Sequence, residues 1–115
     1  IQAYPELNII CCADDTMAMG VVNTVISAGK SGDIMITGSN GDDGVLGFIE
    51  SGDMTATTGN YLGLMSKKYA ELTLEVALDK WDKTQTEYSM GEEVIELVDI
   101  NNVQEFTTEK YTKTE

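Results

Sequence analysis

The sequence predicts an α/β domain in which a mostly parallel sheet is covered by helices. Short apolar, β-branched runs alternate with longer segments whose apolar residues recur at helical spacing. Small or polar residues follow each apolar run and begin the next helix. A repeated strand–helix order is typical of parallel strands joined by right-handed crossovers, which place helices on the sheet faces. We therefore expect a three-layer α/β fold, and the 115 residues give room for one small domain.

The first predicted strand and helix meet at a pair of aspartates. Residues 8–13 (NIICCA) are apolar and in part β-branched, which predicts a strand buried on both faces. The apolar spacing of residues 15–29 predicts a helix. An aspartate at a helix start accepts hydrogen bonds from the free N–H groups of the first turn. One cap needs only one side chain, so one of the two carboxylates is available to a ligand, and Asp14 is the preferred candidate. Both aspartates lie at the sheet edge where α/β proteins bind ligands.

The middle of the chain continues the alternation. Residues 33–39 and 54–58 are predicted strands, and residues 42–51 form the predicted helix between them. The turn at residues 38–44 (GSNGDDG) is rich in glycine but lacks the lysine of a phosphate-binding loop. Asn40 in this turn is a turn residue that tolerates a positive φ, a ligand-binding side chain, or both.

The last part of the chain begins with the longest predicted helix. Residues 61–81 have a broad apolar face, and Trp81 at the far end is expected to cap the core. The short elements predicted after it are extended segments at residues 87–90 and 94–100 and a helix from residue 101. The polar tail, residues 107–115, is repetitive in Thr, Lys and Glu and is expected to be frayed.

Composition argues against several classes of function. The net charge is −13 with only seven Lys and Arg, so there is no basic cluster to neutralise the phosphates of a nucleic acid or an anionic membrane. The chain has no histidine, and the adjacent Cys11 and Cys12 lack the spacing of metal ligands. Neither a metal site, a cofactor nor a Cys–His nucleophile pair is predicted. Because neighbouring strand residues point to opposite faces, we expect both cysteines to be buried free thiols.

Four segments, in order, resemble one known family. Residues 14–20 (DDTMAMG), continuing as VVNTVISAGK, are similar to the segment ND.MA.G…AL..AGK of type 1 periplasmic sugar-binding proteins, the ribose/galactose-binding group. Residues 34–41 (IMITGSNG) resemble that family's VVGFDG, and residues 50–60 (ESGDMTATTGN) resemble its..G.L.AT.AQ. Residues 94–106 (VIELVDINNVQEF) resemble its closing v.lvt.eNv.ef. The match covers nearly the whole chain.

The resemblance implies a partial domain of the type 1 periplasmic binding protein fold, from the carboxyl-terminal part of a two-lobed protein. Residues 1–60 would belong to the ligand-binding lobe, and residues 61–94 would pack in the other lobe. Residues 95–115 would form the return segment and tail. A fragment that lacks its second lobe must refold onto itself or pair with another copy, so a homodimer of the fragment is one expectation.

The resemblance also implies three ligand-binding residues. Asp14, Asn40 and Asn60 stand at the family's contact positions, where the family has Asn, Asp and Gln. The exchange of Asn and Asp keeps the total charge but moves its position, and Ser39 replaces an aromatic residue that would pack on the ligand. Carboxylates accept hydrogen bonds from hydroxyls and amides both accept and donate, which suits a neutral polyhydroxylated molecule.

The function implied is that of the substrate-binding component of a sugar ABC importer. Such a protein binds a monosaccharide or polyol in a two-lobed cleft, contacts the membrane subunits of the transporter, and lies in the periplasm or lipid-anchored at the cell surface. The ligand-sensing domain of a LacI-type transcription regulator shares the fold and the first motif, and it is the alternative. An enzyme ranks last, because paired carboxylates without a nucleophile, a histidine or a metal set do not form a catalytic site.

Overall fold

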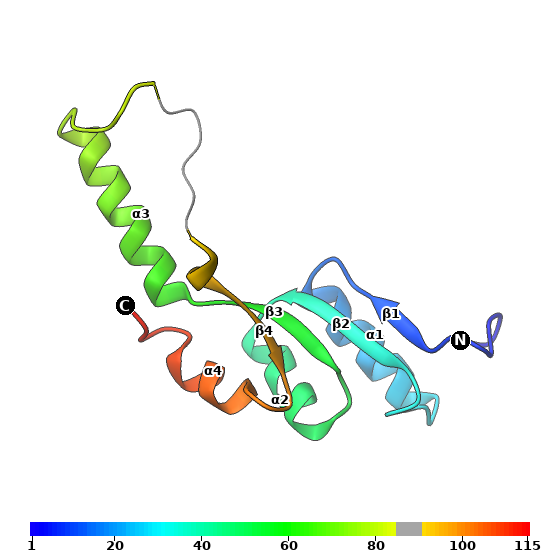
Figure 1. The fold of residues 1–115 in the computed structure, drawn as a ribbon. Coiled ribbons are helices and arrows are strands. Elements are labelled where there is room, and N and C mark those ends of the chain that lie inside the picture. The colour runs from blue at the N-terminus through cyan, green and yellow to red at the C-terminus, as the bar shows by residue number, and fades with distance from the viewer. Residues whose placement is uncertain (85–90) are drawn as a thin grey trace.

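The computed structural model describes residues 1–84 and 91–115, which form a four-stranded sheet flanked by helices (Figure 1). The strands are β1 (Ile9–Cys11), β2 (Met35–Asn40), β3 (Ala56–Asn60) and β4 (Ile95–Asp99). The helices are α1 (Asp15–Ser27), α2 (Asp43–Ser51), α3 (Leu62–Ala77), the 3₁₀ helix η1 (Glu92–Val94) and α4 (Val103–Glu109). The strand order is β1-β2-β3-β4, with β1, β2 and β3 parallel and β4 antiparallel to β3. The predicted α/β class and mostly parallel sheet are confirmed; the extended segment predicted at residues 87–90 lies outside the described residues.

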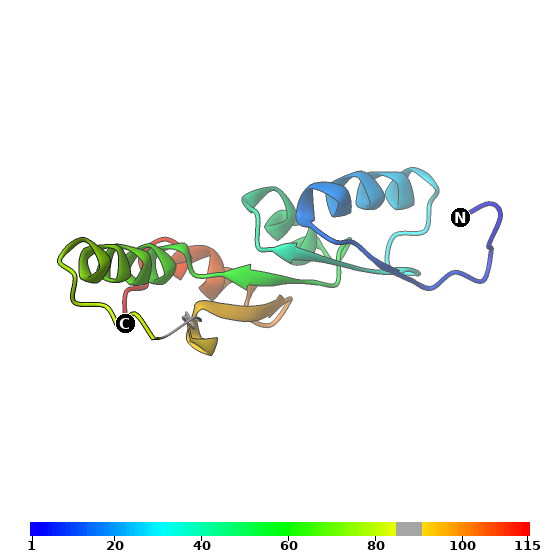
Figure 2. The ribbon, with the colours of Figure 1, turned by 90° about the horizontal axis from the view of Figure 1, so that it is seen from above.

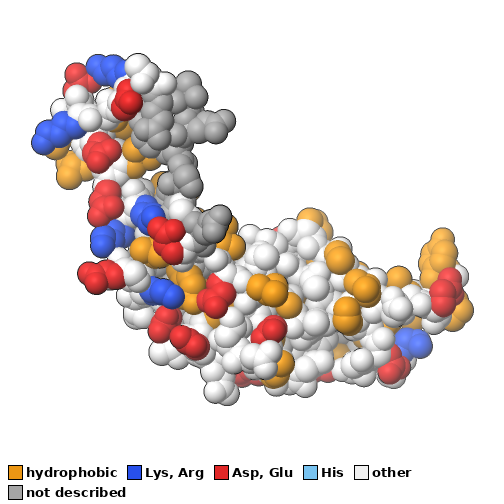
Figure 3. Space-filling view, viewed as in Figure 1, with side chains coloured by type: hydrophobic (Ala, Val, Ile, Leu, Met, Phe, Trp, Pro, Cys, Tyr) orange, Lys and Arg blue, Asp and Glu red, His pale blue; other side chains and the backbone are white. Residues whose placement is uncertain are grey.

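Helices cover one face of the sheet. Figure 2 shows α1 and α2 on the same side, and α4 packs against α2. The buried core between helices and sheet comprises, among others, Val22, Val25, Ile36, Val45, Ile49, Val98 and Phe106. On the opposite face Met35, Ile95 and Leu97 are 47%, 55% and 63% exposed, and apolar side chains are visible there in Figure 3. The described part of the chain thus supplies two of the three predicted layers.

The first strand is less buried than predicted. Ile9 is 47% exposed, Cys11 is exposed and Cys12 is half-buried. The reason is that β1 is an edge strand of the described sheet, where it pairs with β2 alone, and that no described helix covers its outer face. The prediction of buried thiols is therefore wrong, although both cysteines are free as expected. Partial burial and the neighbouring charges of Cys11 and Asp14 raise the pKa of the Cys12 thiol.

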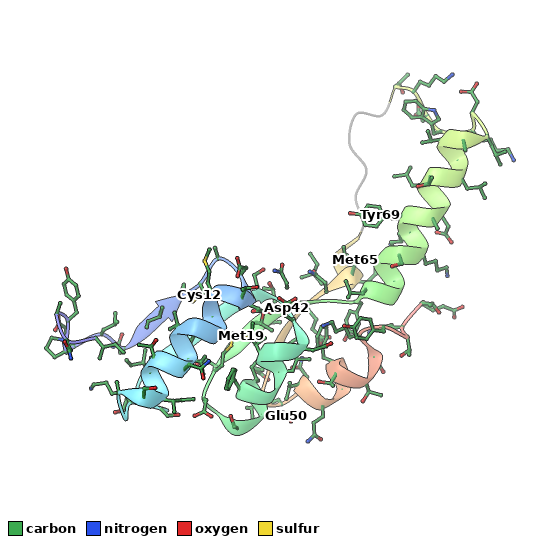
Figure 4. All side chains as sticks on the ribbon, turned by 180° about the vertical axis from the view of Figure 1, so that it is seen from behind. Cys12, Met19, Asp42, Glu50, Met65 and Tyr69 are labelled. Carbon is green, nitrogen blue, oxygen red and sulfur yellow. The ribbon has the colours of Figure 1, made fainter. Side chains whose placement is uncertain are left out.

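Helix α3 projects away from the sheet (Figure 1). Its one buried residue is Leu64, whereas Leu74 and Val76 are about half exposed, at 59% and 48%. The radius of gyration is 17.9 Å, against about 13 Å for a compact domain of this length. The side chains of Met65 and Tyr69 lie on the same side of this helix (Figure 4). Most of the apolar face predicted for residues 61–81 is thus unburied. Trp81 is not part of the core, so the prediction that it caps the core is wrong.

The tail is ordered against α3, so the prediction of a frayed end is wrong. The Gly63 amide donates to the Lys110 carbonyl at 3.2 Å, and the Lys67 ammonium donates to the Thr114 carbonyl at 3.0 Å. The Lys113 ammonium lies 4.0 Å from the centroid of the Tyr61 ring. The first N–H groups of a helix have no partner within it, and the tail carbonyls supply one. No helix among the described residues is both long and apolar enough to cross a bilayer.

Tyr61 lies between β3 and α3, where the chain leaves the sheet. It is 4% exposed, its amide donates to the Val94 carbonyl at 2.9 Å, and its hydroxyl donates to the Glu96 carboxylate. The Glu96 carboxylate also accepts from the Asn102 amide at 3.1 Å. Burial, followed by the hydrogen bond to Glu96 and its negative charge, raises the pKa of Tyr61 above its ordinary value. This network ties the two segments that lead into and out of the projecting part of the chain.

The raised pKa predicts an alkaline loss of stability that depends on Tyr61. The native state holds the phenolic proton more tightly than the unfolded chain, whose tyrosines titrate near pH 10, so the contribution is complete below that pH and declines above it by up to about 1.4 kcal/mol per pH unit. We expect the difference in unfolding free energy between wild type and Tyr61→Phe to shrink between pH 9 and pH 11 in urea titrations. The four other tyrosines are present in both proteins, so the comparison isolates the change at Tyr61. A difference independent of pH would contradict the role of the Tyr61 proton.

Candidate functional site

Three polar residues predicted from the sequence lie along one edge of the sheet. Cys11 pairs with Thr37, so Asp14 and Asn40 each follow the paired residues by three positions. Asn40 pairs with Gly59, which places Asn60 one residue beyond that pair. Neighbouring strands are about 4.8 Å apart, so the carboxyl ends of β1, β2 and β3 bring these residues to the same edge. This is the edge at which open α/β sheets bind ligands.

Asp14 caps α1. Its backbone is extended, with φ −149° and ψ 169°, and its Oδ1 accepts a hydrogen bond from the Met17 amide at 2.8 Å. The side chain is half-buried, and Oδ2 has no hydrogen-bond partner in the described part of the chain. The cap therefore uses one oxygen and leaves the other for a further donor.

Asn40 and Asn60 present amides without internal partners. Asn40 is exposed and ends β2 with φ 115°, so it adopts the positive φ that the sequence analysis allowed for it. Asn60 is half-buried where β3 ends against Ile95 of β4. Within residues 1–84 and 91–115 neither side-chain amide makes a hydrogen bond, so both retain a donor and an acceptor.

Asp15 was ranked behind Asp14 as a ligand-binding carboxylate from the sequence, and the structure engages both of its oxygens within the chain. It is fully buried, its Oδ2 accepts from the Asp42 amide at 2.8 Å, and its Oδ1 accepts from the Thr57 hydroxyl at 2.8 Å. Figure 4 shows Asp42 where the sheet meets α2. A Cβ at position 38 would collide with Oδ1 of Asp15, so the strand needs Gly38 there. A glycine inside a strand is a known sign of such a close approach and is the signal that could have revealed this contact.

Lys110 approaches the same turn from α4. It is 3% exposed, and its ammonium donates to the Gly41 carbonyl at 2.5 Å and to Asp43 Oδ1 at 3.0 Å. The Tyr111 hydroxyl donates to Asp43 Oδ2 at 3.0 Å. The hydrogen bonds from Lys110 and Tyr111 lower the pKa of Asp43 below its ordinary value. Sequence reasoning missed Lys110 because it lies in the tail that was expected to be frayed.

The arrangement supports binding by hydrogen bonds. One free carboxylate oxygen and two amides at a strand edge can accept from and donate to the hydroxyl groups of a neutral solute. Among the described residues no group of three His, Cys, Asp or Glu side chains could hold a metal ion. A site of this kind discriminates between ligands because its polar groups are left unpaired when a hydroxyl is missing.

Comparisons with known proteins give a consistent result. Residues 1–80 match the model of a family described as the periplasmic binding protein domain. The D-allose-binding periplasmic protein of Escherichia coli (strain K12) is 44% identical over 57 residues, which are 50% of this chain and 18% of that protein.

Solved structures share the fold over nearly the whole chain. An ABC transporter solute binding protein from Agrobacterium vitis with bound D-fucose aligns with 95% of this chain at a TM-score of 0.77 and 20% identity. A periplasmic solute binding protein from Actinobacillus succinogenes with bound D-allose aligns with 90% at a TM-score of 0.73 and 23% identity. The chain spans 36% and 35% of these two proteins, about a third of their length.

Proposed function

Because the chain belongs to the periplasmic binding protein domain family, we propose that it forms the carboxyl-terminal part of the sugar-binding component of an ABC importer. The observation that carries the proposal is the alignment of Asp14, Asn40 and Asn60 at the carboxyl ends of three neighbouring parallel strands. The family is defined by solute binding, which agrees with the prediction of a binding protein rather than an enzyme.

The proposed ligand is a monosaccharide or a related neutral polyol. Oδ2 of Asp14, which has no partner among the described residues, would accept from a hydroxyl, and the amides of Asn40 and Asn60 would accept or donate. The E. coli relative is named for D-allose, and the two solved structures hold D-fucose and D-allose. These sugars are therefore the first candidates for the ligand.

The proposed mechanism is closure of two lobes around the sugar. Residues 1–60 would form part of one lobe, residues 61–94 would pack in the other, and residues 95–115 would return. The projection of α3 away from the sheet and its exposed apolar residues support this division (Figure 1). Asn60 then stands where the chain passes between the lobes, next to the Tyr61 network. Hinge closure buries the ligand between surfaces that are apart in the open form.

The proposal is tested by binding to the complete protein encoded by the reading frame that contains this chain. Isothermal titration calorimetry with D-allose and D-fucose is expected to give saturable one-to-one binding with at least one of them. An encoded export signal and a second βα lobe upstream would agree with the proposed location outside the cytoplasm. An upstream helix-turn-helix would instead identify an intracellular sensor of the LacI type. The absence of binding to every sugar and polyol tested would overturn the proposal.

A further inference from the structure

The last residue of β2, where the strand leads into the turn before α2, is strained and lies at the candidate site. Asn40 has φ 115°, and its side chain is exposed. A non-glycine residue at positive φ costs on the order of 1–3 kcal/mol and persists only where the surrounding structure enforces it. The features that enforce this conformation therefore also fix where the Asn40 amide lies.

Two buried groups of opposite charge hydrogen-bond to the same peptide group, which lies one residue beyond Asn40. The carboxylate of Asp15 accepts from the Asp42 N–H, and the ammonium of Lys110 donates to the Gly41 carbonyl. This carbonyl and this N–H belong to one peptide group, that between residues 41 and 42. If the group flipped, its carbonyl would face the carboxylate and its N–H would face the ammonium, so both interactions would turn repulsive. Burial strengthens this preference, because Asp15 and Lys110 are 0% and 3% exposed.

The same carboxylate connects the other two strand ends. Asp15 directly follows Asp14, and its second oxygen accepts from the Thr57 hydroxyl on β3, three residues before Asn60. One side chain, from the first residue of α1, thus contacts the turn after β2 and the strand β3. Its position sets the three strand ends relative to one another.

We propose that Asp15 and Lys110 are positioning residues. Their hydrogen bonds to the 41–42 peptide group hold the end of β2 so that the Asn40 amide faces the ligand. The inference rests on the proposed sugar-binding function. Neither residue needs to touch the sugar. These two hydrogen bonds prevent the turn from relaxing in the unliganded protein. The free energy needed to strain Asn40 is therefore supplied on folding and does not reduce the free energy of binding.

The test combines a spectroscopic measurement on this chain with a binding measurement on the complete protein. Lys110→Met keeps a long side chain without the charge, and Lys68→Met is the matched control, because Lys68 pairs with Glu93 away from the turn. In ¹H–¹⁵N spectra we expect Lys110→Met to shift or broaden the amide signals of residues 40–42 and Lys68→Met to leave them in place. Should Lys110→Met not fold, Asp15→Asn, which preserves the size of the side chain, provides the same comparison through the Asp42 amide.

The binding measurement uses D-allose as the probe, with both methionine variants shown to be folded by circular dichroism. Release of the strained turn is expected to weaken binding by about 5- to 150-fold in Lys110→Met, and Lys68→Met is expected to bind as wild type does. The inference is overturned if the amide signals of residues 40–42 are unchanged in Lys110→Met or Asp15→Asn. It is also overturned if Lys110→Met binds D-allose with wild-type affinity. If the wild-type protein binds no D-allose, that result counts against the sugar assignment, and the spectra alone decide whether the two hydrogen bonds hold the turn.

Discussion

Replacement of Phe106 by alanine is expected to lower the free energy of unfolding by about 3–5 kcal/mol, as for other fully buried aromatic residues. Phe106 is 0% exposed, and its ring centroid lies 5.3 Å from that of Tyr61. A Cβ at position 59 would overlap the Phe106 ring, which shows how closely the ring packs on Gly59 at the end of β3. Its removal leaves a cavity beneath the strand ends that carry the candidate site.

Urea unfolding followed by circular dichroism measures this effect. Phe48→Ala is the matched control, because Phe48 is the other phenylalanine of the chain and is only half-buried on α2. We expect the control to lose clearly less stability, with a similar dependence on denaturant concentration in both variants. A loss in Phe106→Ala no larger than that in Phe48→Ala would show that α4 is not part of the core.

Local patterns were sufficient to predict most of the elements. The alternation of apolar runs and helical spacing predicted β2, α2 and β3 within a few residues, because these elements are buried on the side that their own sequence indicates. Asp14 was predicted at a helix start and caps α1. The predicted edge location of Asp14, Asn40 and Asn60 follows from parallel pairing, which the register shows.

The errors concern features that depend on the rest of the fold. The apolar run of β1 suggested burial, but burial depends on neighbours, and among the described strands only β2 lies beside β1. The polar tail suggested fraying, yet its carbonyls are the partners of Gly63 and Lys67 on a helix nearly fifty residues earlier in the chain. Polar composition alone does not reveal such partners.

The hydrogen bonds of Asp15 and Lys110 to the 41–42 peptide group could not be predicted from the sequence either, because they also depend on the rest of the fold. Asp15 meets Thr57 across 42 residues, and Lys110 meets Gly41 across 69. No spacing rule connects positions so far apart, and a buried aspartate has the same local signature as an exposed helix cap. The only local hints were Gly38 inside a strand and a second aspartate that the cap did not require.

Replacement of Asp14 by serine is expected to weaken binding of D-allose to the complete protein by about 10- to 150-fold, the equivalent of one hydrogen bond to a charged group. Serine caps a helix about as well as aspartate, so the unfolding free energy should stay within about 0.5 kcal/mol of wild type. Asp14→Ala removes cap and carboxylate together and should cost about 1 kcal/mol of stability in addition to the same loss of affinity.

The pair of variants separates the two roles of this side chain. Oδ1 is engaged by the Met17 amide and Oδ2 is unpaired among the described residues, so the observed cap and the proposed ligand contact would use different oxygens. Calorimetric titration of both variants with D-allose, beside urea unfolding, measures each role by itself. If Asp14→Ser binds D-allose as tightly as wild type does while Asp14→Ala is destabilised, Asp14 is only a helix cap. The sugar would then be held at this edge without the Asp14 carboxylate, and Asn40 and Asn60 would be the next residues to replace.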